Sequence, residues 1–134
     1  MIHLDTSFLI RALVHDSPED RTLRKWLKDG QSLGMSAVAW TELLCGPLEE
    51  SHLELAIRVV SQRVAFLEED AILSARLFND SGRRRGSLID CMVAASALRA
   101  GEPLATANVA DFRRFAAHGL TILEPSRRFE KVRP

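Results

Sequence analysis

The chain lacks a net charge and contains only two cysteines. Its 134 residues include 18 Lys and Arg and 18 Asp and Glu, so any nucleic-acid site must be a local basic patch. Cys45 and Cys91 lie in apolar helical patterns, which favours buried free thiols over a disulfide framework or a zinc site. We therefore expect a reducing, cytoplasmic location.

Targeting and membrane signals are also missing. The opening MIHLDTSFLI has no basic start and is interrupted by Asp5, unlike a signal peptide, and no apolar run approaches the roughly 18 residues of a membrane span. Repeats and internal linkers are absent, and 46% hydrophobic residues suffice for a core. We expect one domain over residues 1–134, with a loosely held basic end at 127–134.

Short apolar segments alternate with helical patterns along the chain. Strands are expected at residues 1–4, 33–35, 64–67, 104–105 and 121–123. Helices are expected at 6–14, 18–30, 36–45, from 51 onward, 70–80, 87–98 and 109–116, with Ser17-Pro18 and Ser51-x-x-Glu54 as start signals. The alternation predicts an α/β fold with a parallel sheet, in which ligands bind beyond the carboxyl ends of the strands.

A single charge interrupts the apolar segment GSLIDCMVAASAL, residues 86–98. Asp90 lies in a helix that is apolar on all sides and is therefore largely buried. One interpretation is a helix start, in which Asp90, three residues after Ser87, meets free backbone N–H groups. The other is a functional carboxylate, because a buried carboxylate must be paired, hydrogen-bonded or bound to a cation.

Other acids stand in similar settings. Asp5 ends the first strand, where it caps the next helix, provides a carboxylate at a ligand-binding strand end, or does both. Glu42 is the solitary charge in SAVAWTELLCG, and taken alone it favours a helix face turned to water. Asn108 and Asp111 follow the strand at 104–105, where helix capping accounts for both.

The solitary acids Asp5, Glu42 and Asp90 mean more together than singly. Packed at neighbouring strand ends, they would repel and raise one another's pKa. Mg²⁺ or Mn²⁺ removes this conflict, because hard divalent cations prefer oxygen ligands, and such an ion also lowers the pKa of a bound water. The pattern therefore predicts metal-assisted hydrolysis of a phosphodiester.

Other chemical motifs are absent or ambiguous. The chain has no GxSxG, GxGxxG or P-loop motif, and its four histidines lack metal-ligand spacing, with His3 expected on the sheet surface. The loop Arg83, Arg84 and Arg85 precedes the Asp90 helix. It is either solvated or in contact with phosphates or a partner's carboxylates.

Four segments resemble the PIN domain family, and within it the VapC-type toxins of bacterial toxin–antitoxin pairs. The segments are LDTSFL, AVAWTELLCG, RRRGSLIDCMVAASAL and LATANVADF, in the family's order and spanning nearly the whole chain. The resemblance implies a three-layer α/β/α sandwich with a five-stranded parallel sheet. It also implies a Mg²⁺- or Mn²⁺-dependent endoribonuclease that is restrained by a small antitoxin, as a homodimer or a hetero-oligomer.

The same resemblance assigns roles to residues. Asp5 and Asp90 match direct metal ligands, and Glu42 matches an acid that acts on the metal or its water. Thr6 or Ser7 matches a hydroxyl position after the first acid. Asn108 stands where many PIN domains have an aspartate, so Asp111 supplies the fourth carboxylate or the site has three. One bound ion is favoured over two.

Alternatives remain open from the sequence alone. One is a non-catalytic PIN-like module that binds partners or nucleic acid, and another is a metal-dependent nuclease or phosphatase with a different substrate. The apolar residues Trp26, Leu27, Trp40 and Leu44 either line an antitoxin groove or belong to the core.

Overall fold

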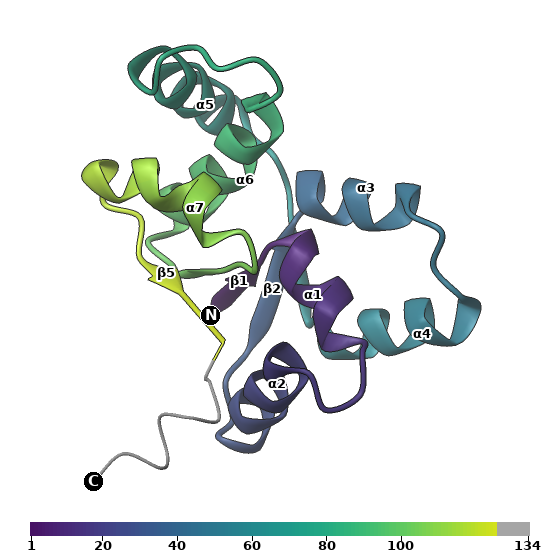
Figure 1. Ribbon diagram of the computed structural model, residues 1–134. Coiled ribbons are helices and arrows are strands. Elements are labelled where there is room, and N and C mark those ends of the chain that lie inside the picture. Colours follow the sequence, from purple (N-terminus) through teal and green to yellow (C-terminus); the bar gives the residue numbers. More distant parts are fainter. Residues whose placement is uncertain (126–134) are drawn as a thin grey trace, which may run out of the picture.

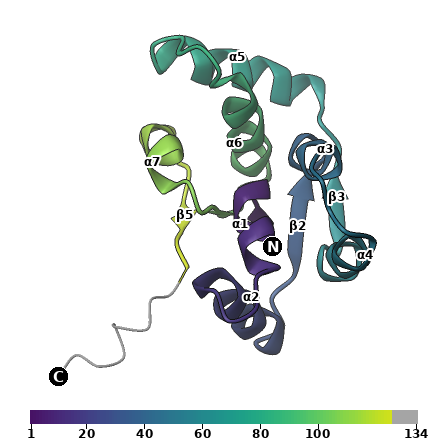
Figure 2. The same cartoon turned by 45° about the vertical axis from the view of Figure 1, so that its right-hand side comes forward.

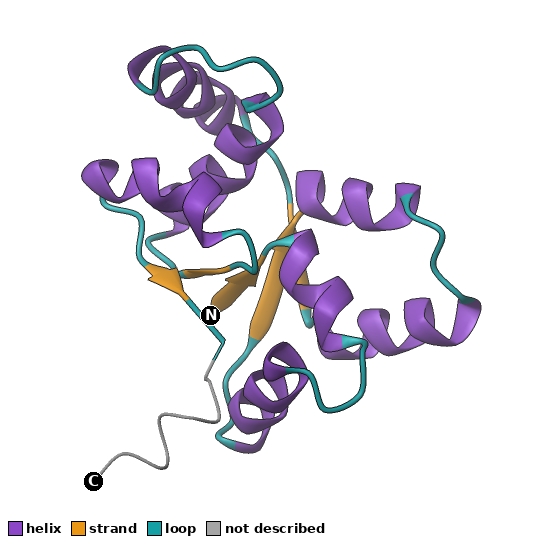
Figure 3. Ribbon diagram, in the orientation of Figure 1, coloured by secondary structure: helices purple, strands orange, loops and turns teal. Residues whose placement is uncertain are grey.

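Five short strands form one parallel sheet in the computed structural model, which describes residues 1–125 (Figure 3). The strands are β1 (Ile2–Leu4), β2 (Leu33–Ser36), β3 (Gln62–Val64), β4 (Leu104–Ala105) and β5 (Ile122–Leu123). Their order across the sheet is β3-β2-β1-β4-β5, and every neighbouring pair is parallel. The expected α/β fold is confirmed, whereas the basic end at 127–134 lies outside the described residues.

Helices cover both faces of this sheet. They are α1 (Thr6–Ala12), α2 (Pro18–Lys28), α3 (Ala37–Cys45), α4 (Glu50–Val59), α5 (Glu68–Asp80), α6 (Leu88–Ala100), α7 (Val109–Phe112) and the 3₁₀ helix η1 (Arg113–His118). Crossovers between parallel strands are right-handed, so α1 to α4 and α5 to α7 lie on opposite sides (Figures 1 and 2). Within residues 1–125, no helix has the length and apolarity needed to span a membrane.

The path of the chain diverges between the two central strands, β1 and β4. From β1 the chain continues to β2 on one side, and from β4 it continues to β5 on the other. Leu4 pairs with Ala105, so Asp5 and Thr106 follow adjacent strands at the carboxyl edge of the sheet. Open α/β sheets bind their ligands at such a switch point.

The core lies between the sheet and the two helical layers. Phe8, Phe112 and Phe115 are fully buried, and Trp26 of α2 stacks on Phe8 with ring centroids 5.5 Å apart. Helix α6 is buried at Cys91 and from residue 93 to 97, as its apolar composition predicts. Burial on this scale fixes α6, and with it Asp90, against the sheet.

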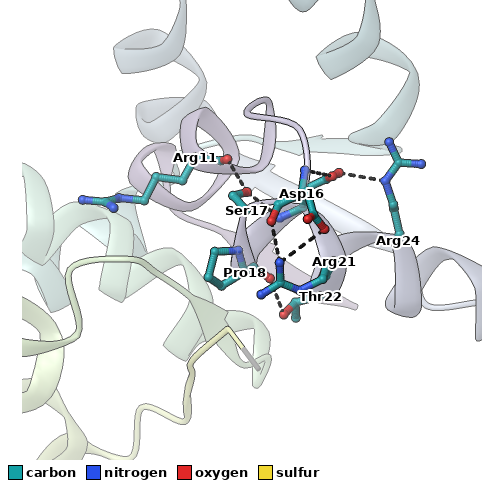
Figure 4. A network of polar contacts seen from close by, with 8 residues as sticks. Arg11, Asp16, Ser17, Pro18, Arg21, Thr22 and Arg24 are labelled. Carbon is teal, nitrogen blue, oxygen red and sulfur yellow. Dashed lines mark hydrogen bonds and ion pairs between the residues drawn. The ribbon is translucent and has the colours of Figure 1, made fainter. Parts of the chain in front are cut away.

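Hydrogen bonds fix α2 against the end of α1, as Figure 4 shows. Ser17 caps α2 as expected, because its Oγ accepts a hydrogen bond from the Asp20 N–H at 3.0 Å, and it donates to the Arg11 carbonyl at 2.7 Å. The Asp20 carboxylate accepts hydrogen bonds from the Asp16 N–H at 2.8 Å and from Arg24 at 2.9 Å. The angle between α1 and α2 is therefore set by polar contacts as well as by packing.

Several expected element boundaries differ from the structure: α1 ends at residue 12 and not 14, α5 begins at 68 and not 70, α6 ends at 100 and not 98, and the helix expected at 109–116 is divided into α7 and η1. Two further differences have an identifiable local cause. Strand β3 ends at Val64 rather than spanning 64–67, because Leu67 precedes α5 and its N–H donates to the Asp70 carboxylate at 2.8 Å. Helix α4 begins at Glu50 after Glu49, with no side-chain cap, so the Ser51-x-x-Glu54 spacing is not a capping box.

Two expectations about burial are also wrong. His3 is 1% exposed and lies in a central strand covered on both faces, not on an open sheet surface. Cys45 is exposed at the end of α3, whereas Cys91 is buried as expected.

The buried carboxylate of Asp70 yields a stability prediction. Asp70 is 0% exposed, accepts the Leu67 N–H and forms an ion pair with Arg99 of α6. Asp70→Ala removes these contacts and is expected to lower the free energy of unfolding by about 2–4 kcal/mol in urea denaturation. Asp29→Ala, which removes the exposed partner of Lys25, should cost less than about 0.5 kcal/mol. Equal losses in the two variants would contradict this assignment.

Candidate active site

Two hydroxyl groups hold the Asp5 carboxylate at the switch point. Asp5 is 5% exposed, and its Oδ2 accepts hydrogen bonds from Ser7 Oγ at 2.7 Å and from Thr106 Oγ1 at 2.9 Å. The Ala107 N–H donates to Ser7 Oγ at 3.2 Å and so ties the β4 end to α1. Asp5 occupies the N-cap position of α1, but its side chain makes no cap hydrogen bond. Its carboxylate is therefore oriented mainly by hydroxyl groups, and the backbone N–H groups of Thr6 and Ser7 at the start of α1 also act on its pKa.

Thr6 links α1 to the helix that carries Glu42. Its hydroxyl donates to the Ala39 carbonyl at 2.7 Å and contacts Glu42 Oε1 at 3.5 Å. Helix α3 starts at the carboxyl edge because Ser36, the last residue of β2, caps it by accepting the Ala39 N–H at 3.0 Å. Glu42 is exposed, which agrees with the prediction that it lies on a helix face turned to water. It also lies close enough to Asp5 and Asp90 for their charges to raise its pKa.

Asp90 lies half-buried in the first turn of α6. Ser87 occupies the N-cap position but makes no cap hydrogen bond, and its hydroxyl donates instead to the Arg84 carbonyl at 2.7 Å. The interpretation of Ser87-x-x-Asp90 as a capping pair is therefore wrong. The same bond fixes the basic loop at the start of α6, where Arg83, Arg84 and Arg85 are all exposed.

The segment after β4 brings Asn108 and Asp111 to the same edge. Asn108 occupies the N-cap position of α7, but its side chain makes no cap hydrogen bond, contrary to the capping interpretation. Its N–H donates to Thr106 Oγ1 at 3.0 Å. Asn108 and Asp111 are exposed and border a pocket of about 560 Å³.

Sequence reasoning missed Thr106. A threonine after a strand is an ordinary residue, and its contact with Asp5 spans 101 positions. The signal that identifies it is spatial, because Asp5 and Thr106 follow paired strands.

Burial raises the pKa of Asp5, Glu42 and Asp90, and repulsion by neighbouring acids contributes at Glu42 and Asp90. Burial raises the pKa of Asp5, against the effect of its two hydroxyl donors. Burial, followed by the charges of Asp5 and Asp90, raises the pKa of Glu42. Burial, followed by the charges of Asp5 and Asp111, raises the pKa of Asp90 to about 6. The charges of Asp5, Asp90 and Asp111 therefore reach neighbouring acids across the carboxyl edge.

Two arginines oppose this accumulation of negative charge. Arg114 of η1 and Arg84 of the basic loop both lower the pKa of Asp90, though less than burial raises it. Arg114 was not among the residues singled out from the sequence.

The donor set suits a hard divalent cation in its chemistry. Asp5, Glu42, Asp90 and Asp111 offer only oxygen ligands, as Mg²⁺ and Mn²⁺ prefer. Among residues 1–125, however, no three His, Cys, Asp or Glu side chains meet closely enough, as oriented, to hold one ion. A common ion therefore requires side-chain rotation at the carboxyl edge.

The raised pKa of Asp90 predicts how stability depends on pH. Its pKa of about 6 exceeds the ordinary value of about 3.9, so the metal-free fold loses stability as the pH rises from about 4 through about 6. Asp90→Asn removes this loss. In EDTA at pH 7.5, its free energy of unfolding should exceed that of the unmodified chain by on the order of 1 kcal/mol, allowing for solvent screening.

Urea denaturation at pH 4 and at pH 7.5 measures this effect, and the difference should vanish at the lower pH. Glu54→Gln, a charge removal at an exposed position on α4, serves as the control and should show no such gain. A lack of stabilisation by Asp90→Asn at pH 7.5 would count against the repulsion described above.

Comparisons with known proteins agree with this architecture. The chain is similar to a chain of VapBC2 from Rickettsia felis, bound to a promoter DNA fragment, with TM-score 0.73 and 20% identity over 92% of this chain and 98% of that one. It is similar to a chain of a toxin–antitoxin complex from Klebsiella pneumoniae, with TM-score 0.72 and 20% identity over 95% and 99%. For VapBC-1 from nontypeable Haemophilus influenzae the TM-score is 0.70, with 22% identity over 95% and 100%.

These similarities establish the fold, and none of the curated protein sequences matches. The family assignment comes from a sequence model. The PIN domain model matches residues 2–118, a range that includes Asp5, Glu42, Asp90 and Asp111. The chain therefore belongs to the PIN domain family.

Proposed function

We propose that this PIN domain is a Mg²⁺- or Mn²⁺-dependent endoribonuclease and the toxin of a toxin–antitoxin pair. The observation that carries the proposal is the gathering of Asp5, Glu42, Asp90 and Asp111 at the switch point, where charges of neighbouring acids raise the pKa of Glu42 and Asp90. Repulsion between these carboxylates does not stabilise the fold. Binding of a ligand that reverses the repulsion is therefore the simplest explanation for why the acids lie together. A divalent cation has that charge and prefers those donors.

Each residue of the site then has a definite task. Asp5 and Asp90 would hold the ion, and Ser7 and Thr106 keep Asp5 in one orientation. Glu42, contacted by the Thr6 hydroxyl, would act on the ion or on its water. When bound, the ion would lower the pKa of water and neutralise charge on a phosphoryl oxygen.

A pocket of about 560 Å³ offers room beside Asn108 and Asp111, in the size range of small-molecule sites. Asp5, Glu42 and Asp90 do not line this pocket, and its lining also includes Glu19, Glu124 and Arg113. The exposed guanidinium of Arg84, near Asp90, provides a positive charge for a neighbouring phosphate.

The nuclease proposal predicts RNA cleavage that requires Mg²⁺ or Mn²⁺ and stops in EDTA. Asp5→Asn and Asp90→Asn should reduce cleavage to the EDTA background while circular dichroism shows an intact fold, because each removes a charged ligand. Glu54→Gln should cleave like the unmodified chain. Comparing RNA, DNA and small phosphoesters under one metal condition tests the substrate class. Undiminished cleavage by Asp90→Asn, or preferential cleavage of DNA, would contradict the proposal.

An apolar groove between α1, α2 and α4 is the proposed docking site for the antitoxin. It has a volume of about 140 Å³, and its lining includes Leu9, Leu13, Leu23, Leu27 and Leu55. Leu27 and Leu55 are 43% and 41% exposed, so the groove presents apolar surface to solvent. An amphipathic helix of a partner suits such a groove. The solved complexes named above, in which similar chains occur with antitoxins, support this partner class.

The residues predicted from the sequence for an antitoxin groove agree only in part with this lining. Trp26 and Trp40 are partly buried and packed against the core, and Trp40 lies under Arg63 at 4.6 Å. Leu44 is 52% exposed on α3 and is not part of the groove lining, whereas Leu27 is.

The toxin proposal predicts that expression of the unmodified chain arrests bacterial growth and that co-expression of a small antitoxin encoded beside it restores growth. Leu27→Asp should weaken the rescue, because a charge in the groove opposes docking of an apolar helix face. Ile72→Asp, at a 58% exposed position on α5, should leave the rescue intact. Healthy growth with high expression of the unmodified chain alone would refute the toxin role.

A further inference from the structure

Arg114 is a partly buried cation beside the proposed metal site. Its guanidinium carbon lies 4.5 Å from the ring centre of Phe115, a fully buried residue. Its Nε and Nη2 atoms are buried and have no hydrogen-bond partner. Burying unpaired donors of a charged group opposes folding, so core packing alone does not explain this arrangement.

The surroundings of Arg114 also disfavour a cation, with one exception. Arg114 follows α7, which packs against α6, and its charge acts on Asp90 and Cys91 in the first turn of α6. The start of a helix is the positive end of its dipole. Burial raises the pKa of the Cys91 thiol, although the charge of Arg114 and a hydrogen bond from its side chain act in the opposite direction. A neutral thiol is only a weak acceptor, so this contact does not satisfy the guanidinium. Asp111 also lies in this region but is exposed, whereas Asp90 is half-buried and the charge of Arg114 lowers its pKa, so Asp90 is the acceptor we favour.

We propose that Arg114 is a positioning residue for Asp90. When Asp90 turns one carboxylate oxygen toward a divalent cation, its other oxygen accepts the free N–H groups of Arg114. Carboxylates that bind metals are themselves held by hydrogen bonds of this kind, and the planar guanidinium, packed over the ring of Phe115, presents Nε and Nη2 as a rigid fork. Because these two atoms have no exposed surface, RNA or a partner protein does not reach them as they stand.

The inference rests on the proposed metal site and predicts the sign of a measurable effect. A cation that merely lies near the ion repels it, so removing that cation would tighten Mn²⁺ binding. A residue that holds the ligand in place has the opposite effect, because its loss weakens metal binding by about 10- to 100-fold. The direction of the change therefore separates positioning from bystander charge.

The experiment is a calorimetric titration of metal-free chain with Mn²⁺ at pH 8, where Asp90 is ionised. Arg114→Met retains a flexible apolar chain on Phe115 but removes the charge and the donors. Its Kd for Mn²⁺ should rise by about 10- to 100-fold. Arg113→Met removes the same charge from the exposed neighbouring arginine and should change the Kd by less than about threefold.

Thermal unfolding in EDTA provides the second readout. At pH 4.5, where Asp90 is protonated and gains nothing from the neighbouring charge, Arg114→Met should melt no lower than the unmodified chain, because it removes unpaired buried donors. A merely structural role for Arg114 predicts the reverse pattern, a lower Tm with unchanged Mn²⁺ binding. If Arg114→Met does not fold, Arg114→Gln is judged by the same criterion of Kd.

Unchanged or tighter Mn²⁺ binding by the Arg114 variant overturns the inference. If the unmodified chain binds no Mn²⁺, the metal site of the proposed function fails, and the inference fails with it. If the unmodified chain and the Arg114 variant bind Mn²⁺ equally, only the inference fails.

Discussion

The hydrogen bonds from Ser7 and Thr106 to Asp5 are the interaction on which the site depends. A carboxylate that is 5% exposed is costly to bury unless its oxygens are hydrogen-bonded. The two hydroxyl groups meet this need at the place where the connections after β1 and β4 diverge. A negative charge is thereby held at the centre of the carboxyl edge, and its effect reaches Glu42 and Asp90.

Other elements of the fold place further negative charge close to Asp5. The buried middle of α6 fixes Asp90 there, and the cap at Ser36 starts α3 so that Glu42 lies nearby. Two arginines oppose the repulsion only in part, since the pKa of Asp90 remains raised. Sites arranged for function commonly sacrifice stability in this way. The hydroxyl groups that orient Asp5, and Arg114 in its proposed role, limit how the charged side chains move.

The fold followed from the sequence because its signals are local. Short apolar strands alternate with helices, and the Ser17-Pro18 start signal is confirmed at α2. The acids were found because each stands alone in an apolar stretch. Capping signals based on spacing failed for a local reason, since Ser87 has helical backbone angles, φ −95° and ψ −4°, instead of the extended ones that a capping side chain needs. The sequence could not show this.

Contacts between distant segments were beyond the sequence. Thr106 became part of the site only when the pairing of β1 with β4 placed it beside Asp5. Arg114 is one of two adjacent arginines, and nothing in the sequence separates the partly buried one from the exposed Arg113. Burial in a central strand likewise overrides the polarity of His3. In each case the decisive information is which elements pack together.

The central claim is that these carboxylates share one divalent cation, and the anomalous scattering of Mn²⁺ in a crystal of this chain tests it most directly. The account predicts an ion at the carboxyl edge of the sheet, coordinated by oxygens of Asp5 and Asp90. An ion bound elsewhere, or none at saturating Mn²⁺, would contradict it.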